Sequence, residues 1–406
     1  MTRQEKLLLI LLAGLNFTHI LDFIIMMPLG NYLIGDLHIT AFQFSLLVAV
    51  YSISAFFSGL AIATFIDRFD RKKPLLFAYI GFLAGTIACG FANSFVLLLL
   101  ARIMAGTFGG IIGAQIFAIV ADLFPYEKRG RAMGIVMGGF AIASILGVPI
   151  SLFVINLFHH DWHLPFLMIG AVGIILVPLI IRIVPNMTGH IREVEEDNLF
   201  GALFKVTRIK IQRSALCFSG LLMMGHFLII PFINPYLEFN KGFSKDALPN
   251  LYLIGGMASL VAALYLGRMA DKKGKLKVFS ISILMSMVMV WVVTQMPPVA
   301  FGLVLLFFAL FFMVATGRIV TAQAMITQVV NPEQRGSFMS INGSIQQLGS
   351  GIAALCAGAI VRTQHDHKIL HYEYVGYLSI LVLLLTWLFA KKIFRNLDNN
   401  AREVNS

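Results

Sequence analysis

Residues 95–123 read FVLLLLARIMAGTFGGIIGAQIFAIVADL, an apolar run whose only charged residues are Arg102 and, near its end, Asp122. A bilayer core of ~30 Å needs ~20 mainly apolar residues to cross it as a helix. The run exceeds that length and contains no proline. It therefore predicts a transmembrane helix with one arginine inside it.

The same pattern recurs along the whole chain, which is 58% hydrophobic and 13% charged, with a mean hydropathy of +0.85. Soluble domains usually carry about 25% charged residues. The sequence therefore predicts an all-α integral membrane protein surrounded by lipid bilayer, with 12 transmembrane helices. The expected runs are 7–34, 42–66, 74–92, 95–123, 131–157, 165–184, 214–238, 247–270, 277–295, 298–330, 336–361 and 373–394.

Composition and motifs also argue against several other classes of protein. The net charge of +11 resides mainly in short loops, so we expect no nucleic-acid partner. The three cysteines lie in apolar runs without metal-ligand spacing, and we expect no metal and no cofactor. Neither an H-E-x-x-H, a G-x-S-x-G nor a P-loop motif occurs. We therefore expect no catalytic residues and no enzyme activity, and a membrane enzyme or a non-transporting sensor is the weaker alternative.

The charges of the loops predict the orientation. If the N-terminus is cytoplasmic, 25 Lys and Arg residues lie on the inside and 4 in the outside loops. The positive-inside rule then places both termini in the cytoplasm of a multi-pass plasma-membrane protein, which we expect to be a bacterial inner-membrane protein.

Two six-helix halves are indicated by internal repeats. Asp67 and Asp271 follow the second and eighth runs and lie 204 residues apart, and two Arg-Gly pairs recur at an offset of 206. Near-constant offsets indicate a duplicated unit, as in transporters with a site between repeats. The expected parts are an N-terminal bundle at 1–184, a cytoplasmic linker at 185–213, a C-terminal bundle at 214–395 and a cytoplasmic tail at 396–406.

These repeats carry motifs that resemble those of the major facilitator superfamily over essentially the whole chain. The loop signature matches at Asp67, Arg68, Arg71 and Lys72, and its second copy matches at Gly267, Asp271, Gly274 and Lys275. Arg102 and Gly106 resemble the R-x-x-x-G motif of proton-coupled members. Gly147-Val148-Pro149 partly matches the antiporter motif, and the first run resembles the sugar-efflux and drug:proton antiporter branch.

The resemblance implies two bundles around a cavity that opens to one side at a time. It also implies proton-coupled efflux of a small molecule, such as a sugar or drug, by a monomer. Proton symport and facilitated import of a small solute stay open as alternatives.

Ionisable groups inside the runs are the candidate proton-coupling residues, because charge in a membrane is costly. Asp22 lies near the middle of the first run, with His19 one turn before it. In the resembled family, the arginine at the position of Arg102 interacts with a proton-binding acid. We therefore assign proton coupling to Asp22, His19 and Arg102, with a purely structural ion pair as the alternative.

Other polar side chains within the runs are expected to line the substrate cavity. They are Asn16, Gln115, Asn234, Arg318 and Gln346. Arg318 has no counterpart in the first half, which favours an anionic group of the substrate or a partner for Asp22. A gate or packing pair is the alternative.

A cytoplasmic gate and a set of helix-packing positions complete the expectations. The gate residues are Asp67, Arg68, Arg71, Asp122 and Asp271, with Asp122 expected to pair with Arg71. Gly106, Gly110, Gly113, Gly147 and Pro149 are assigned to close helix packing or bending. Two histidine-rich outside loops, 159–163 and 365–371, are interpreted as solvated loops, with metal binding as the less favoured alternative.

Overall fold

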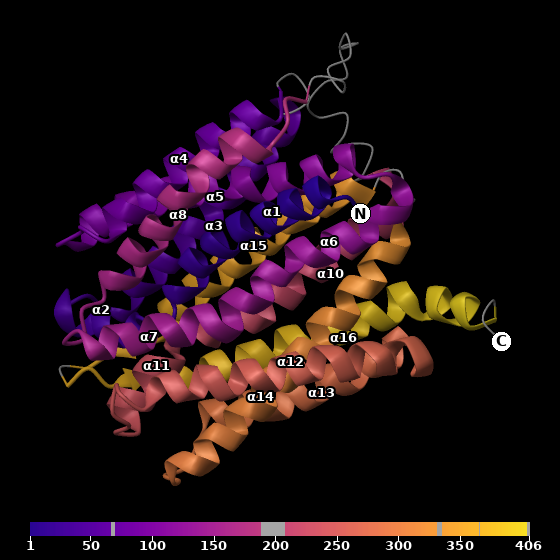
Figure 1. The fold of residues 1–406 in the computed structure, drawn as a ribbon. Helices are drawn as coiled ribbons and strands as arrows, with labels where there is room; N and C mark the ends of the chain where they lie inside the picture. The colour runs from indigo at the N-terminus through magenta and orange to yellow at the C-terminus, as the bar shows by residue number, and fades with distance from the viewer. Residues whose placement is uncertain (66–69, 188–207, 331–334, 365, 404–406) are drawn as a thin grey trace. The chain divides into compact units, whose positions relative to one another are not determined.

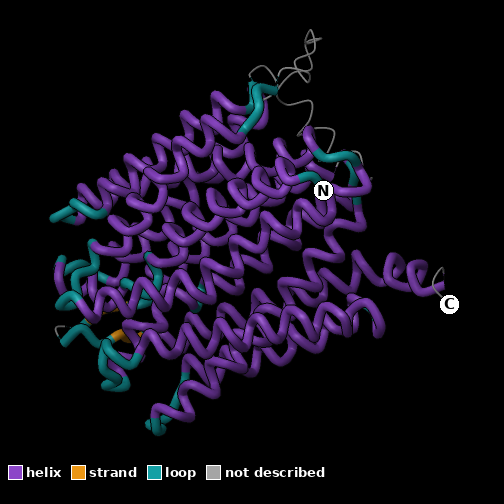
Figure 2. Tube along the Cα trace, viewed as in Figure 1, coloured by secondary structure: helices purple, strands orange, loops and turns teal. Residues whose placement is uncertain are grey.

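The computed structural model describes residues 1–65, 70–187, 208–330, 335–364 and 366–403 (Figure 1). These residues form helices almost throughout, joined by short loops (Figure 2). Among them, eleven helices are long and apolar enough to cross a membrane. The all-α membrane fold is therefore confirmed. Expected gate residues Asp67 and Arg68 lie outside the described residues, as do residues 188–207 of the expected linker.

The helix that corresponds to the remaining expected run is α15 (Arg335–Ile360). It has the length of a membrane span, but it carries several amide and hydroxyl side chains, including Asn342, Gln346 and Gln347. Apolar character alone therefore does not identify it as a span, and the count of twelve stays a prediction.

The chain divides into two compact units, of which the first comprises Met1–Met26, Leu47–Arg208 and Pro332–Leu348. Within it, α4 packs against α5 and α8, and α1 packs against α6 and α8 (Figure 1). Its helices are α1 (Arg3–Ile25), most of α3 (Ala41–Phe65), α4 (Lys72–Cys89), α5 (Phe95–Leu123), α6 (Tyr126–Ile142), α7 (Val148–Leu157), α8 (Leu164–Ile183) and the beginning of α15.

Helix α5 carries the central arginine of this unit, and the sequence explains both of its ends. The Ser94 side chain accepts a hydrogen bond from the Leu97 amide, at 3.4 Å, and caps the first turn. At the other end Phe124 is extended, as a residue before a proline prefers, and Pro125 follows it. The expected run 95–123 therefore coincides with the observed helix.

Glycines bring α3 and α5 close together. A Cβ atom on Gly106 would lie 2.4 Å from the backbone oxygen of Tyr51, and one on Gly110 would lie 2.3 Å from that of Ala55. Real Cβ atoms essentially never come so close to backbone. Glycine at these two positions is therefore required for the observed approach of the two helices.

The second unit comprises Met27–Leu46, Ile209–Asn331 and Gly349–Ser406. Within it, α14 packs against α12 and α13, and α16 packs against α10 and α13. Its elements are α2 (Gly30–Asp36), the start of α3, α10 (Lys210–Phe227), α11 (Ile233–Pro235), α12 (Leu248–Lys273), α13 (Lys275–Thr294), α14 (Phe301–Ile326), the rest of α15, β1 (Arg362–Thr363), β2 (Ile369–Leu370) and α16 (Tyr372–Glu403). Strands β1 and β2 pair antiparallel, with Arg362 opposite Leu370.

Three expected runs are not continuous α-helices. Run 7–34 is divided because α1 ends at Ile25 and α2 begins at Gly30, with Pro28 between them. Run 131–157 contains a π-helical turn at Ala143–Gly147, shortly before Pro149. Run 214–238 breaks after Phe227 and continues through short turns that contain two prolines. Proline removes a backbone donor and crowds the preceding turn, which explains all three interruptions.

Candidate functional site

The centre of the first unit is an ion pair between α1 and α5. Arg102 Nη1 donates to Asp22 Oδ2 at 2.8 Å and to the Asp22 backbone oxygen at 3.1 Å. Both side chains are 0% exposed. The pairing that the sequence suggested for these two residues is therefore present.

Tyr51 of α3 forms the other side of the pair. Its ring centroid lies 4.4 Å from the Arg102 guanidinium carbon, a cation–π distance. The Tyr51 hydroxyl donates to the His19 backbone oxygen at 3.2 Å, and Phe23 stacks on the same ring at 5.4 Å. The guanidinium thus contacts a carboxylate from one helix and an aromatic face from another, and its position depends on both.

His19 lies against the glycine face of α5. Its ring is 8% exposed, and its Nδ1 makes no hydrogen bond within the described part of the chain. A Cβ atom on Gly109 or Gly113 would lie 3.9 Å from a ring nitrogen of His19, an ordinary van der Waals distance, so the imidazole packs against this face of α5. The imidazole can therefore accept or release a proton without first breaking a bond through Nδ1.

The chemistry of the pair differs between its two members. A buried charge is tolerated only when it is paired and hydrogen-bonded. Asp22 can also become neutral by taking a proton, whereas the Arg102 guanidinium cannot lose one. Of the two partners, only Asp22 can therefore take up a proton. Protonation removes the negative charge that attracts the Arg102 guanidinium.

Two of the expected cavity residues lie on α1 and α5 in the same unit. Asn16 Nδ2 donates to the Val136 backbone oxygen of α6 at 2.9 Å, which ties α1 to α6. Gln115 is 0% exposed, and neither its Oε1 nor its Nε2 makes a hydrogen bond within the described residues. An unsatisfied buried amide is costly, so Gln115 is the more informative of the two. A third, Gln346, is half-buried on α15.

The expected pair at the end of α5 is also present. Arg71 Nε donates to Asp122 Oδ2 at 2.8 Å, and the arginine is 4% exposed. Next to it, Asp70 Oδ1 accepts from the Met187 amide at 2.7 Å. This end of the unit therefore depends on charge contacts between the α4 start, α5 and the segment after α8. Asp271 is exposed on α12 in the second unit.

The second unit holds its own buried cation. Arg318 of α14 is 1% exposed and donates through Nη2 to His226 Nδ1 of α10 at 2.9 Å. Sequence reasoning missed His226 and Tyr51. His226 is the only imidazole in the apolar run 214–238, which was the available signal. For Tyr51 no sequence signal distinguished it from other aromatic residues.

Asn234, the remaining expected cavity residue, has both amide atoms engaged. Its Nδ2 donates to the Pro28 backbone oxygen at 2.8 Å, and its Oδ1 accepts from the Tyr252 hydroxyl at 3.0 Å. It therefore anchors the segment between α1 and α2 within the second unit.

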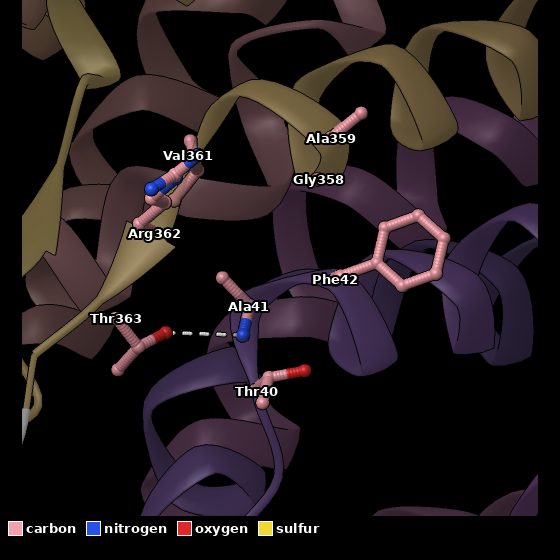
Figure 3. Close-up of a pocket in the computed structure, with 8 residues that line it drawn as sticks. All are labelled: Thr40, Ala41, Phe42, Gly358, Ala359, Val361, Arg362 and Thr363. Atoms are coloured by element: carbon pink, nitrogen blue, oxygen red, sulfur yellow. Dashed lines mark hydrogen bonds between the residues drawn. The ribbon is translucent and has the colours of Figure 1, made fainter.

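One cavity of about 420 Å³ lies in the second unit where α3 begins and α15 ends. Figure 3 shows the Thr363 side chain turned toward the Ala41 amide, which donates to its Oγ1 at 3.0 Å. The cavity contains no buried charged side chain, because Arg362 is exposed. The cavity therefore provides few polar groups that could bind a specific ligand.

Metal ligands do not gather within the described residues, where no group of three or more His, Cys, Asp or Glu side chains surrounds a common point. In the histidine-rich loop between α7 and α8, His163 Nδ1 contacts Asp161 Oδ1 at 2.6 Å. Partial burial raises the pKa of the Asp161 carboxyl, but the hydrogen bonds from the His163 amide and ring together outweigh it, so this pKa lies below its usual value.

Comparison with known proteins identifies the family. The sequence model of the Major Facilitator Superfamily matches residues 11–215 and again residues 215–405. The chain belongs to the Major Facilitator Superfamily. The resemblance seen in the sequence motifs is confirmed, and with it a multi-pass membrane transporter with a small-molecule substrate.

Two relatives are similar to this chain over most of its length. An uncharacterised MFS-type transporter of Bacillus subtilis, YceJ, is 25% identical over 347 residues, covering 84% of this chain and 85% of the relative. A second from the same organism, YtbD, is 25% identical over 362 residues and covers 87% of each chain.

The fold is similar to that of a bacterial homologue of the human lysosomal transporter Spinster in an inward-facing, unoccupied conformation. The TM-score is 0.74 at 15% identity, with 97% of this chain and 98% of that chain covered. The nucleoside transporter NupG gives a TM-score of 0.71 at 15% identity, covering 97% and 100%. At these identities the likeness concerns the superfamily fold alone.

Proposed function

We propose that this superfamily member is a proton-coupled secondary transporter that exports a small molecule, such as a sugar or drug, across the plasma membrane. The observation that carries the proposal is the fully buried Asp22–Arg102 ion pair. Ionisable residues inside membrane spans are rare because they are costly, and they mark ion and proton pathways. In the proposed topology both termini are cytoplasmic.

The coupling follows from the different chemistry of the two partners. When Asp22 is ionised, the guanidinium of Arg102 stabilises it and links α1 to α5. When Asp22 takes a proton, the attraction falls and Arg102 is left with the backbone oxygen and the Tyr51 ring. If each access state favours one protonation state of Asp22, proton movement and the conformational cycle are coupled.

The membrane potential is a sufficient source of energy for this process. One charge that crosses 100 mV releases about 2.3 kcal/mol. At about 1.4 kcal/mol per tenfold change, one inward proton supports an uphill gradient of roughly 50-fold.

The Arg71–Asp122 pair is proposed as a conformational contact on the cytoplasmic side. It lies at the end of α5, remote in sequence from Asp22 and Arg102, and it joins the start of α4 to α5. Its role is to stabilise one access state, so its loss alters rates of exchange more than substrate affinity.

The test of the proposal is uphill transport in proteoliposomes. A growth screen of an overexpressing strain against sugars, drugs and dyes first identifies a substrate. Wild-type protein then accumulates that substrate across an imposed pH gradient, and Asp22→Asn binds it without accumulation. His19→Ala shifts the pH profile and keeps transport. The matched control is Asp161→Asn, which removes a loop acid and leaves accumulation unchanged.

Accumulation by Asp22→Asn at the wild-type rate would overturn the proposal. The direction of the gradient that drives accumulation separates efflux from symport, since an exporter moves substrate against the proton flow.

A further inference from the structure

The buried arginine of the second unit, Arg318, lacks a carboxylate partner within the described residues, whereas Arg102 of the first unit has one. Arg318 is 1% exposed, and the ion pairs within the described ranges do not include it. Its Nε and Nη1 make no hydrogen bond there either. A buried charge without a counter-charge is one of the most expensive arrangements in a protein. Its presence indicates that a negative group arrives from elsewhere.

The single contact of Arg318 does not supply that negative charge. A guanidinium only donates hydrogen bonds, so His226 Nδ1 must be the acceptor in the 2.9 Å contact with Arg318 Nη2. The imidazole is therefore neutral, with its proton on Nε2. The Phe311 ring of α14 lies roughly parallel to the same imidazole, with 6.4 Å between the ring centroids.

The geometry of the guanidinium leaves one complete binding edge open. Nη2 carries two hydrogens, one parallel to the Nε hydrogen and one parallel to a hydrogen of Nη1. Whichever of them His226 accepts, the other still forms a two-pronged edge with Nε or with Nη1, and neither of these has a partner. Such an edge matches the two oxygens of a carboxylate or phosphate group.

We propose that Arg318, held by His226, is the recognition site for an oxyanion group on the transported molecule, so that the substrate class is organic acids or phosphate esters. This inference rests on the proposed transport function. The alternative of a pair between Arg318 and Asp22 is disfavoured, because Asp22 is already bonded to Arg102. Since Arg318 is covered in this structure, the ligand reaches it in another state of the transport cycle.

The experiment measures ligand binding by thermal unfolding of the purified full-length protein in detergent, at constant pH and without a gradient. The probes are matched pairs: glucuronate with glucose, glucose 6-phosphate with glucose, and salicylate with salicylamide. At least one anionic probe is expected to raise the melting temperature of the wild type, while its neutral partner does not. Comparison of the carboxylate probes with the phosphate probe shows which of the two oxyanions the site prefers.

Variants test the residue assignment. Arg318→Gln is expected to abolish the stabilisation. Arg318→Lys keeps the positive charge but loses the pair of parallel N–H donors, so it should weaken binding of the anion about tenfold. If Arg318→Gln does not fold, the Arg318→Lys variant alone tests the assignment. The matched control is Arg182→Gln, which removes an exposed arginine of α8 and should bind as the wild type does.

Three results would overturn the inference. One is that no anionic probe stabilises the wild type more than its neutral partner. Another is that Arg318→Gln or Arg318→Lys binds the anion as tightly as the wild type. The third is that sodium chloride alone gives the same stabilisation at equal ionic strength. Because this assay measures binding without a gradient and without transport, a failure of the binding site is distinguishable from a failure of proton coupling.

Discussion

Replacement of Asp22 by asparagine should destabilise the protein far more than its small change in shape suggests. The carboxylate is 0% exposed and provides the only negative charge bonded to Arg102 among the described residues. Asparagine keeps the size and leaves the guanidinium buried and charged, since arginine does not lose its proton.

The expected magnitude follows from the burial of both partners. Removal of one member of a buried ion pair costs about 3–5 kcal/mol. No discount for solvent screening applies here, because neither side chain is exposed. The double variant Asp22→Asn/Arg102→Gln removes both charges and lets two amides face each other. It should therefore be more stable than Asp22→Asn alone by about 2 kcal/mol or more.

The assay is equilibrium unfolding in detergent for the wild type, both single variants and the double variant. The partly exposed Lys128–Glu5 pair, with 3.4 Å between Nζ and Oε1, is the matched control. Lys128→Gln should cost far less than Asp22→Asn, because ion pairs that solvent reaches contribute little. If Asp22→Asn costs no more than Lys128→Gln, or the double variant is the least stable of the set, the buried pair does not stabilise the protein.

Three further outcomes are expected. Gly106→Val should prevent folding, because a Cβ atom there meets the Tyr51 backbone at 2.4 Å. The control Gly134→Ala should express normally, because nothing lies within 4 Å of its Cβ position. Equal expression of both variants would refute the requirement for glycine at position 106. Asp122→Asn should slow substrate exchange with unchanged binding affinity, measured by counterflow and by thermal shift, and a loss of affinity would contradict it. In cysteine-accessibility mapping, Thr40→Cys should react from outside and Lys72→Cys from inside, and the reverse pattern would overturn the proposed topology.

Much of the fold was predictable because the bilayer imposes a simple rule on the sequence. Backbone N–H and C=O groups in lipid must form hydrogen bonds within the chain, so a long apolar run is expected to form an α-helix. Run 95–123 illustrates this, since it matches α5 at both ends. Bending near Pro149 was expected, and a π-helical turn at 143–147 lies just before it. The break after Phe227 was not predicted, because it precedes the prolines of that run and the apolar pattern continues through it.

The candidate sites were predictable only in part, because the sequence reveals charged residues in apolar runs but not the contacts between helices. Asp22 and Arg102 were found because charge is rare inside spans. His226 is neutral and aromatic, so it stands out less in an apolar run, and its importance depends on its contact with Arg318 from α14. Tyr51 is placed against Arg102 by the glycine-mediated approach of α3 and α5, which no local pattern reports.

Measurement of proton movement itself is the decisive test of the role of Asp22. Wild-type protein and Asp22→Asn are reconstituted in liposomes that contain a pH-sensitive dye, and an outward substrate gradient is imposed without a pH gradient. We expect the wild type to change the lumenal pH as substrate moves, and Asp22→Asn to leave it constant while substrate still exchanges. A lumenal pH change in Asp22→Asn equal to that of the wild type would contradict the assignment of the proton to Asp22.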